Sequence, residues 1–190
     1  MPLRRPFRYL IGLCAVLMLL GNNNCSKNND TGTPQFVTSI AVQDANNLPA
    51  SAFARGDTIK FVLTIRNRSN SSQTLWFNSS QEYNLAVVQA GTNDVVWNWD
   101  ATQTFDSQFT SLEFTAGETK TFTVTWDQAG NDSAQVDTGK YEVIGGFTVY
   151  NTTGAGSAAD NADSMAQGAP AAGQLFPTVY RALLTPFTIQ

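Results

Sequence analysis

Strict alternation of apolar and polar residues, in two separate segments, constrains this chain more than any other feature. Between residues 58 and 67, apolar side chains occupy every second position, and Val62 is the one exception. Between residues 119 and 126, the apolar residues end in Trp126 and alternate with threonines. Side chains two apart lie on the same face of a strand, so each segment is predicted to be a strand with one buried face.

Other apolar segments are separated by turn residues at intervals of 8 to 14 residues. Charged residues are only 14% of the chain, and Thr, Ser and Asn take their place, which favours strands and turns. The predicted strands are 36–42, 58–67, 74–77, 83–89, 95–99, 112–114, 119–126, 139–147 and 183–189. This pattern predicts an all-β fold, an immunoglobulin-like antiparallel β-sandwich. Because Pro186 lacks an N–H, the last strand is expected at a sheet edge or beginning there.

The N-terminus has the pattern of an export signal. Three arginines in the first eight residues precede an apolar run at 10–20. That run is too short for a transmembrane helix, which needs about 20 residues, and suits a signal peptide. Cys25 follows, before a polar stretch, in an arrangement that resembles a bacterial lipoprotein signal. We predict a signal peptide at 1–24, a lipid on Cys25 and a flexible tether at 25–35; plain cleavage and a retained anchor are the alternatives.

The remaining residues, 36–190, are predicted to form one domain with a low-complexity insertion. Residues 151–173 are rich in Gly, Ala, Ser, Asp and Asn and contain few large apolar side chains. Such a segment has little to bury against the entropy lost on ordering, so disorder is expected. A short helix near 160–167 is the alternative.

Composition argues against an enzyme and against nucleic-acid binding. The chain has no His, and both its cysteines, Cys14 and Cys25, lie in the N-terminal segment. Catalytic triads and His-ligated metal sites are therefore excluded. After the three N-terminal arginines, eight basic residues face fifteen acidic ones, which leaves no basic surface for nucleic acid. No cofactor or resident metal is expected.

Acidic residues offer only weak catalytic or metal-binding candidates. The spacing of Glu113 with Glu118, and of Asp100 with Asp106, does not place either pair across a cleft, so solvated carboxylates are expected. One loop carries four oxygen-bearing side chains that could hold Ca²⁺, although not at EF-hand spacing. They are Asp127, Asn131, Asp132 and Asp137. Asp and Asn also favour turns for their own hydrogen-bonding reasons, and that interpretation is preferred.

Three tryptophans, Trp97, Trp99 and Trp126, could form either a sugar-binding platform or part of the core. Trp97 and Trp99 are two residues apart and are expected on one face of a strand. We expect all three in the sandwich interior.

An ordered series of short motifs resembles the BsuPI family, named for an intracellular proteinase inhibitor. The motifs are Phe61–Ser69 with Asn67, Tyr83–Val88, Val95–Asp100 followed by Phe105, Leu112 with Ala116-Gly117-Glu118-Thr119, Phe122, Trp126-Asp127, and Gly139-Lys140-Tyr141. Ala116 stands where the family usually has Pro. The resemblance implies an immunoglobulin-like sandwich and a proteinase inhibitor.

If the chain inhibits a protease, a rigid exposed loop is expected to enter the active site as a pseudo-substrate. The first candidate is the 101–111 loop, with Phe105 and Phe109 as partner-binding residues; the second is 127–137. The expected partners are a serine protease or another envelope protein, and a membrane through the N-terminal lipid. The alternative is a non-inhibitory immunoglobulin-like module, structural or adhesive, that binds protein or glycan.

Overall fold

The computed structural model describes residues 35–92, 94–152 and 180–190. The chain divides into two units, Met1–Gly32 and Thr33–Gln190, and every described residue belongs to the second. The predicted signal peptide and Cys25 therefore lie outside the described residues. Within the described part, no helix is long and apolar enough to cross a membrane.

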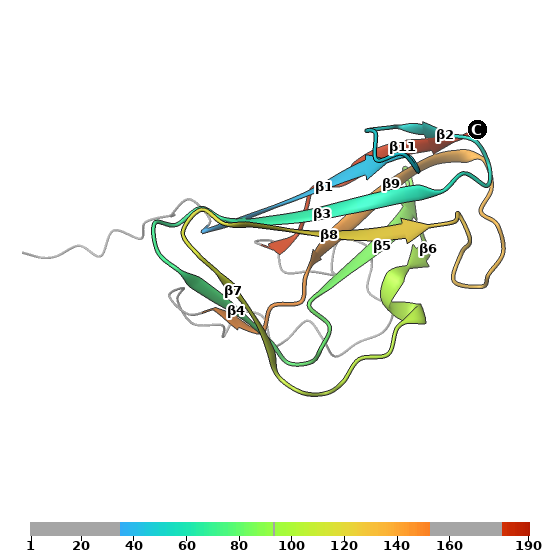
Figure 1. Cartoon of the computed structure of the whole chain (residues 1–190). Coiled ribbons are helices and arrows are strands. Elements are labelled where there is room, and N and C mark those ends of the chain that lie inside the picture. The colour runs from blue at the N-terminus through green and yellow to red at the C-terminus, as the bar shows by residue number, and fades with distance from the viewer. Residues whose placement is uncertain (1–34, 93, 153–179) are drawn as a thin grey trace, which may run out of the picture. The chain divides into compact units, whose positions relative to one another are not determined.

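The described chain is built from short strands and one 3-10 helix (Figure 1). The elements are β1 (Phe36–Gln43), β2 (Ala52–Phe53), β3 (Ile59–Asn67), β4 (Gln73–Phe77), β5 (Tyr83–Gln89), β6 (Val95–Asn98), η1 (Trp99–Thr102), β7 (Thr110–Phe114), β8 (Thr119–Trp126), β9 (Gly139–Phe147), β10 (Asn151–Thr152) and β11 (Thr185–Ile189). They form three sheets with the strand orders β1-β3-β8, β2-β11-β9-β5-β6 and β10-β4-β7. The pairing of β2 with β11 is parallel, and the other strand pairs are antiparallel.

The two alternating segments become neighbouring strands of one sheet. In β3, the inward side chains from Ile59 to Ile65 are fully buried, as the alternation predicts. β8 pairs with β3 along its whole length, with Trp126 opposite Ile59 and Thr119 opposite Arg66. Each strand therefore gives one face to the core and the other to the surface.

Aromatic side chains pack between the β1-β3-β8 sheet and the five-stranded sheet. The ring of Phe61 lies 6.0 Å from that of Trp97, 5.9 Å from Trp126 and 5.8 Å from Phe187, measured between centroids. Trp97 is only 7% exposed and Trp126 only 2%. The prediction that these two tryptophans belong to the core is confirmed.

Trp99 is half-buried and packs against this core, but it departs from the predicted strand, because β6 ends one residue early at Asn98 and Trp99 begins η1. Trp97 and Trp99 therefore do not share a strand face. The chain turns here because Asp100 is tied to β5: Asn84 Nδ2 donates to Asp100 Oδ2 at 2.7 Å, and the Asp100 N–H donates to Asn84 Oδ1 at 3.2 Å. Nothing in the sequence pattern indicates that pair.

The chain bends where β3 leads into β4 and where β7 leads into β8. At this bend the side chain of Asn67 is fully buried, and its Nδ2 donates to the carbonyls of Ser71 and Thr115, both at 2.9 Å. The Oδ1 atom of Asn67 accepts two hydrogen bonds from Ser69, one from the N–H at 2.9 Å and one from the hydroxyl at 2.7 Å. Beyond the bend, β4 and β7 leave the plane of β3 and β8 and form the third sheet (Figure 1).

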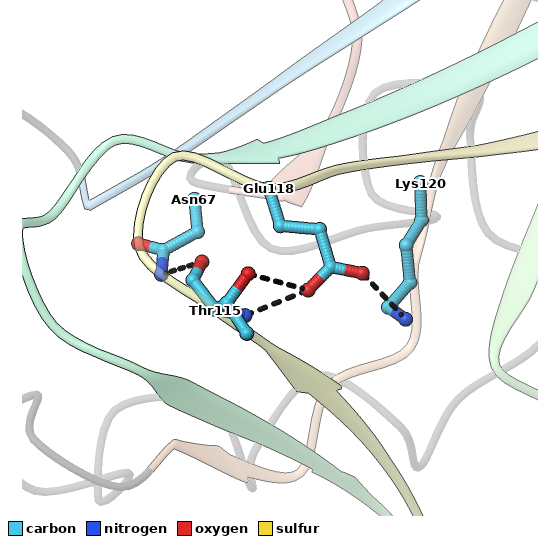
Figure 2. Close-up of polar contacts among 4 residues, drawn as sticks. All are labelled: Asn67, Thr115, Glu118 and Lys120. Carbon is cyan, nitrogen blue, oxygen red and sulfur yellow. Dashed lines mark hydrogen bonds and ion pairs between the residues drawn. The ribbon is translucent and has the colours of Figure 1, made fainter.

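A carboxylate completes this bend, as Figure 2 shows. Glu118 Oε2 accepts two hydrogen bonds from Thr115, one from the N–H at 2.7 Å and one from the hydroxyl at 3.2 Å. The other carboxylate oxygen, Glu118 Oε1, lies 3.1 Å from Lys120 Nζ. These bonds lower the pKa of Glu118, chiefly through the Thr115 N–H and then through Lys120. We call Asn67, Thr115, Glu118 and Lys120 the Asn67 corner.

A tyrosine at the start of β9 carries a mark of immunoglobulin-like sandwiches. The Tyr141 hydroxyl donates to the carbonyl of Asp137, four residues upstream, at 2.6 Å. Such a tyrosine corner, with two packed sheets and no α-helix among the described residues, confirms the predicted fold class.

The last strand is not at the edge of its sheet, so that part of the Pro186 prediction is wrong: β11 lies between β2 and β9. Thr188 and Gln190 direct their N–H groups to Ser51 and Phe53, on the β2 side. Along a strand, the N–H groups of every second residue point to the same side. An N–H at residue 186 would therefore point to the β2 side, like those of Thr188 and Gln190. However, β2 pairs with β11 only at Thr188 and Ile189 and does not extend as far as Pro186. The proline is tolerated because its position is locally an edge.

The predicted insertion at 151–173 begins with a short strand. Asn151–Thr152 forms β10 and pairs with β4 at Trp76 and Leu75. Residues 153–173, including the segment considered as a short helix, lie outside the described residues.

Candidate partner-binding surface

The loop from η1 to β7 is exposed but fastened near its middle. Residues 101–104 and 106–109 are exposed, whereas Phe105 is half-buried with its ring 5.9 Å from that of Trp99. The Asp106 N–H donates to Ser80 Oγ at 2.8 Å, and the Ser80 N–H donates to the Asp106 carbonyl at 2.9 Å. The middle of the loop therefore has a fixed position, and the exposed residues on either side of Phe105 are accessible to a partner.

The two phenylalanines predicted to bind a partner have different surroundings. Phe105 fastens the loop, whereas Phe109 is 67% exposed and makes an edge contact with Tyr150, with centroids 5.8 Å apart. Tyr150 in turn donates its N–H to the carbonyl of Trp76, which is 40% exposed. The exposed rings of Phe109 and Tyr150 therefore lie together, and Trp76 is exposed on the neighbouring strand β4. Sequence reasoning missed Trp76 and Tyr150, because the apolar run Leu75-Trp76-Phe77 does not reveal which face is buried.

The second candidate loop, 127–137, is fastened by a buried amide at its start. Gln128 is fully buried with φ at 65°, and its Nε2 donates to the carbonyls of Ala54 and Asp57 at 2.8 and 2.9 Å. Its Oε1 accepts from the Gly56 N–H at 3.0 Å. The loop and the 54–57 turn are therefore held together, while residues 131–135 stay exposed.

Two of the four oxygen ligands considered for calcium in this loop cap turns, and the other two contact neighbouring segments. Asp127 Oδ1 accepts from the Ala129 N–H at 3.1 Å, and Asp132 Oδ1 accepts from the Ala134 N–H at 2.9 Å. Asn131 Oδ1 accepts from a backbone N–H of β6, and Asp137 lies 3.9 Å from Arg55. Among the described residues, no three acidic or Cys side chains are placed to hold a metal ion.

A shallow cleft of about 460 Å³ lies between the 127–137 loop and the β5–β6 hairpin. Its lining includes Val95, Asn131, Asp132, Gln135 and Tyr141. Burial raises the pKa of Tyr141, so its hydroxyl stays protonated. The cleft can accept a side chain or a turn of a partner.

One carboxylate of each pair considered for acid/base chemistry serves a structural contact. Asp100 Oδ2 accepts from Asn84 and, at 3.2 Å, from Gln81 Nε2. Glu118 belongs to the Asn67 corner. Neither arrangement has the geometry of a general acid facing a general base.

The sequence matches one protein family over more than half of its length. The match covers residues 47–152 and is described as BsuPI, an intracellular proteinase inhibitor. The chain belongs to the BsuPI family. That description names an inhibitor rather than an enzyme. Several motifs behind the resemblance are structural: Asn67 and Glu118 form the corner, and Tyr141 forms the tyrosine corner.

Comparisons beyond the family are distant. No curated protein matches this BsuPI chain. The solved structures similar to it include a β-glucosidase from Erythrobacter marinus at 10% identity (TM-score 0.39), covering 82% of this chain and 15% of the enzyme, and a glucose-bound β-glucosidase from Listeria innocua at 12% (TM-score 0.38), covering 90% and 20%. A CARDB domain from Pyrococcus furiosus, solved with di-metal ions, is similar at 10% identity (TM-score 0.37), covering 84% and 97%. The chain thus spans only about a seventh of the first of these enzymes, so the activity of that enzyme is not assigned to this chain.

Proposed function

We propose that this BsuPI protein inhibits a proteinase by binding it through the 101–109 loop. The supporting observation is that the loop is exposed on both sides of Phe105 while its middle is fixed to Trp99 and Ser80. An inhibitor loop must keep its bound shape before it meets the enzyme, because ordering a loose segment on binding reduces affinity. Phe109 supplies the apolar side chain that a protease pocket takes.

The test measures inhibition constants of the purified protein against trypsin-like, chymotrypsin-like and subtilisin-like serine proteases. We expect micromolar or tighter inhibition of at least one protease. Phe109→Ala is expected to weaken it about tenfold or more, as for a central interface aromatic. Leu48→Ala is the matched control, because Leu48 is 61% exposed on a different loop and should leave inhibition unchanged. Unchanged rates for the whole panel would contradict the proposal, and equal effects of both variants would reject the loop assignment.

One observation favours a second function, that of a non-inhibitory adhesive module. The exposed rings of Trp76, Phe109 and Tyr150 offer flat apolar faces, the kind of surface that stacks against sugars. This function predicts that glycans quench the fluorescence of the protein and that Trp76→Ala abolishes the quenching. It also predicts no effect on any protease.

Export and a lipid anchor at Cys25 complete the proposal. The charged and apolar pattern of residues 4–20 supports them, although the family description names an intracellular protein. Signal peptide 1–24 would be removed and residues 25–35 would tether the domain at Phe36. Mass spectrometry of the mature N-terminus tests cleavage and acylation together. A mature chain that begins anywhere other than a lipid-bearing Cys25 would reject the anchor.

A further inference from the structure

We propose that Tyr150 is a positioning residue for proteinase binding, because its ring holds the ring of Phe109 in the orientation that the partner receives. This inference rests on the proposed inhibition through the 101–109 loop. It extends the inhibitory surface beyond that loop, to the chain segment between β9 and β10.

The backbone of Tyr150 is held at the surface of the fold. Val149, the residue before it, is buried in the core, whereas the ring of Tyr150 is exposed. The Tyr150 N–H donates to the carbonyl of Trp76 at 2.8 Å, and the next residue, Asn151, lies opposite Trp76 in the pair of β10 with β4. The Tyr150 ring therefore leaves the backbone at a fixed point.

The backbone of Phe109 is attached on both sides to the Ser79-Ser80 segment. Before Phe109, the Asp106 N–H donates to Ser80 Oγ at 2.8 Å. After it, the Thr110 hydroxyl donates to the carbonyl of Ser79 at 2.8 Å, and Thr110 is the first residue of β7. Three residues lie between these two attachments. The main chain of Phe109 is therefore confined, and rotation of its side chain is the main freedom that remains.

The contact with Tyr150 restricts that rotation. The two rings meet edge to face, with centroids 5.8 Å apart and ring planes at 61°. This geometry is favourable because the positive edge of one ring faces the negative face of the other. An exposed phenylalanine without such a neighbour samples several rotamers, and binding must then select one of them. The Tyr150 ring therefore reduces the entropy that Phe109 loses when it binds.

The pair of rings remains open to water in spite of this contact. Phe109 is 67% exposed and Tyr150 is 54% exposed. Contiguous exposed apolar surface marks interaction sites, and tyrosine is enriched among the residues that contribute most to interfaces. Because the pair is continuous with the 101–109 loop, its partner is the same proteinase. The pair fits an apolar pocket that takes the Phe109 ring and has the Tyr150 ring at its rim.

The test measures inhibition constants of the purified protein and its variants against the panel of serine proteases. We expect Tyr150→Ala to weaken inhibition about three- to tenfold, the factor that a contact between two aromatic rings supplies. Tyr150→Phe keeps the ring and should inhibit as the natural protein does. Leu48→Ala, on a different loop, is the control and should change nothing. Thermal unfolding should show the same midpoint for all of them, because both residues are exposed.

A double variant separates positioning from an independent contact. If Tyr150 acts through Phe109, adding Tyr150→Ala to Phe109→Ala should have little further effect on the inhibition constant. If the two effects multiplied instead, Tyr150 would bind the proteinase on its own account and the positioning role would be wrong.

The orientation of Phe109 can also be measured without a proteinase. Side-chain scalar couplings from NMR should show one dominant χ1 rotamer of Phe109 in the natural protein and in Tyr150→Phe. In Tyr150→Ala they should show an average over several rotamers. This measurement does not depend on inhibition, so it distinguishes a failure of the positioning role from a failure of the proposed function.

The two failures have different signatures. An unchanged inhibition constant or unchanged Phe109 rotamers in Tyr150→Ala would overturn the positioning role and leave the proposed function standing. Loss of glycan quenching in Tyr150→Ala, with inhibition unchanged, would overturn it by assigning the ring to sugar binding. Absence of inhibition by the natural protein would overturn the proposed function and, with it, any role of Tyr150 in proteinase binding.

Discussion

The two ends of the β3–β8 pair are closed by the same device in different electrostatic surroundings. At one end Asn67, and at the other Gln128, buries a side-chain amide completely and bonds it to the backbone of a neighbouring turn. A buried amide that satisfies both its donors and its acceptor fixes a turn that has few apolar contacts of its own.

The two ends of the β3–β8 pair differ in which chain segments the buried amide connects. Asn67 ties together the chain segments that lead into β4 and β8, so it holds one sheet to another. Gln128 ties an exposed loop to the exposed 54–57 turn. Both ends contain carboxylates that accept backbone hydrogen bonds, Glu118 at the Asn67 end and Asp57 at the Gln128 end, and the bonds that Glu118 accepts lower its pKa. We therefore expect the Asn67 end to contribute more stability and to respond to pH through Glu118, and the Gln128 end to contribute less stability and to govern loop order.

The largest expected effect is that of Asn67→Ala. It leaves the carbonyl of Thr115 and the N–H of Ser69 without their side-chain partner in a partly buried place, and we expect a loss of about 3 kcal/mol in the free energy of unfolding. Urea denaturation measures it. Asn70→Ala is the control, since Asn70 is exposed in the same turn and should change stability by less than about 0.5 kcal/mol. Similar losses for both variants would show that the Asn67 amide does not hold the corner.

A smaller effect is expected for Gln128→Ala. Water can reach the exposed 54–57 turn and replace part of the lost bonding, so the expected loss is about 2 kcal/mol. Limited proteolysis should cut the 54–57 turn and the 127–137 loop together, and should spare the 101–109 loop.

Gln135→Ala supplies the comparison within the same loop. Gln135 is exposed and makes one bond, from Nε2 to the carbonyl of Asp127 at 2.8 Å. Its removal should change stability and cutting little. If Gln128→Ala loosened the 101–109 loop as well, the two candidate loops would not be independent.

The strands could be predicted because their signal is local. Alternating burial follows directly from the geometry of a strand, and β3 and β8 lie where the period-2 pattern places them. The buried ends of these strands could not be predicted in the same way. Asn67 and Gln128 occur in polar stretches that read as ordinary turns, and their partners lie 48 and up to 74 residues away.

The candidate surface was predictable only in outline. The position of the 101–111 loop follows from the strands on either side, but the different roles of Phe105 and Phe109 do not. Phe105 is held because η1 brings Trp99 beneath it, and η1 exists because Asp100 bonds to Asn84 on another strand. A contact of this kind depends on strand register, which a single sequence does not reveal.

The smallest expected effect tests the electrostatic difference between the two ends. The pKa of Glu118 is lowered on folding, so its contribution to stability is complete above the unfolded value of 4.5 and is lost as the pH falls through the lower folded value. Thermal unfolding at pH 7 and pH 3 should therefore show a larger loss for the natural protein than for Glu118→Gln. Thr115→Ala keeps the backbone N–H, the main cause of the shift, and should retain most of the pH dependence. If Glu118→Gln and the natural protein lost the same stability between pH 7 and pH 3, Glu118 would not make the Asn67 end sensitive to pH. The Asn67 and Gln128 ends would then differ only in the chain segments that their amides connect.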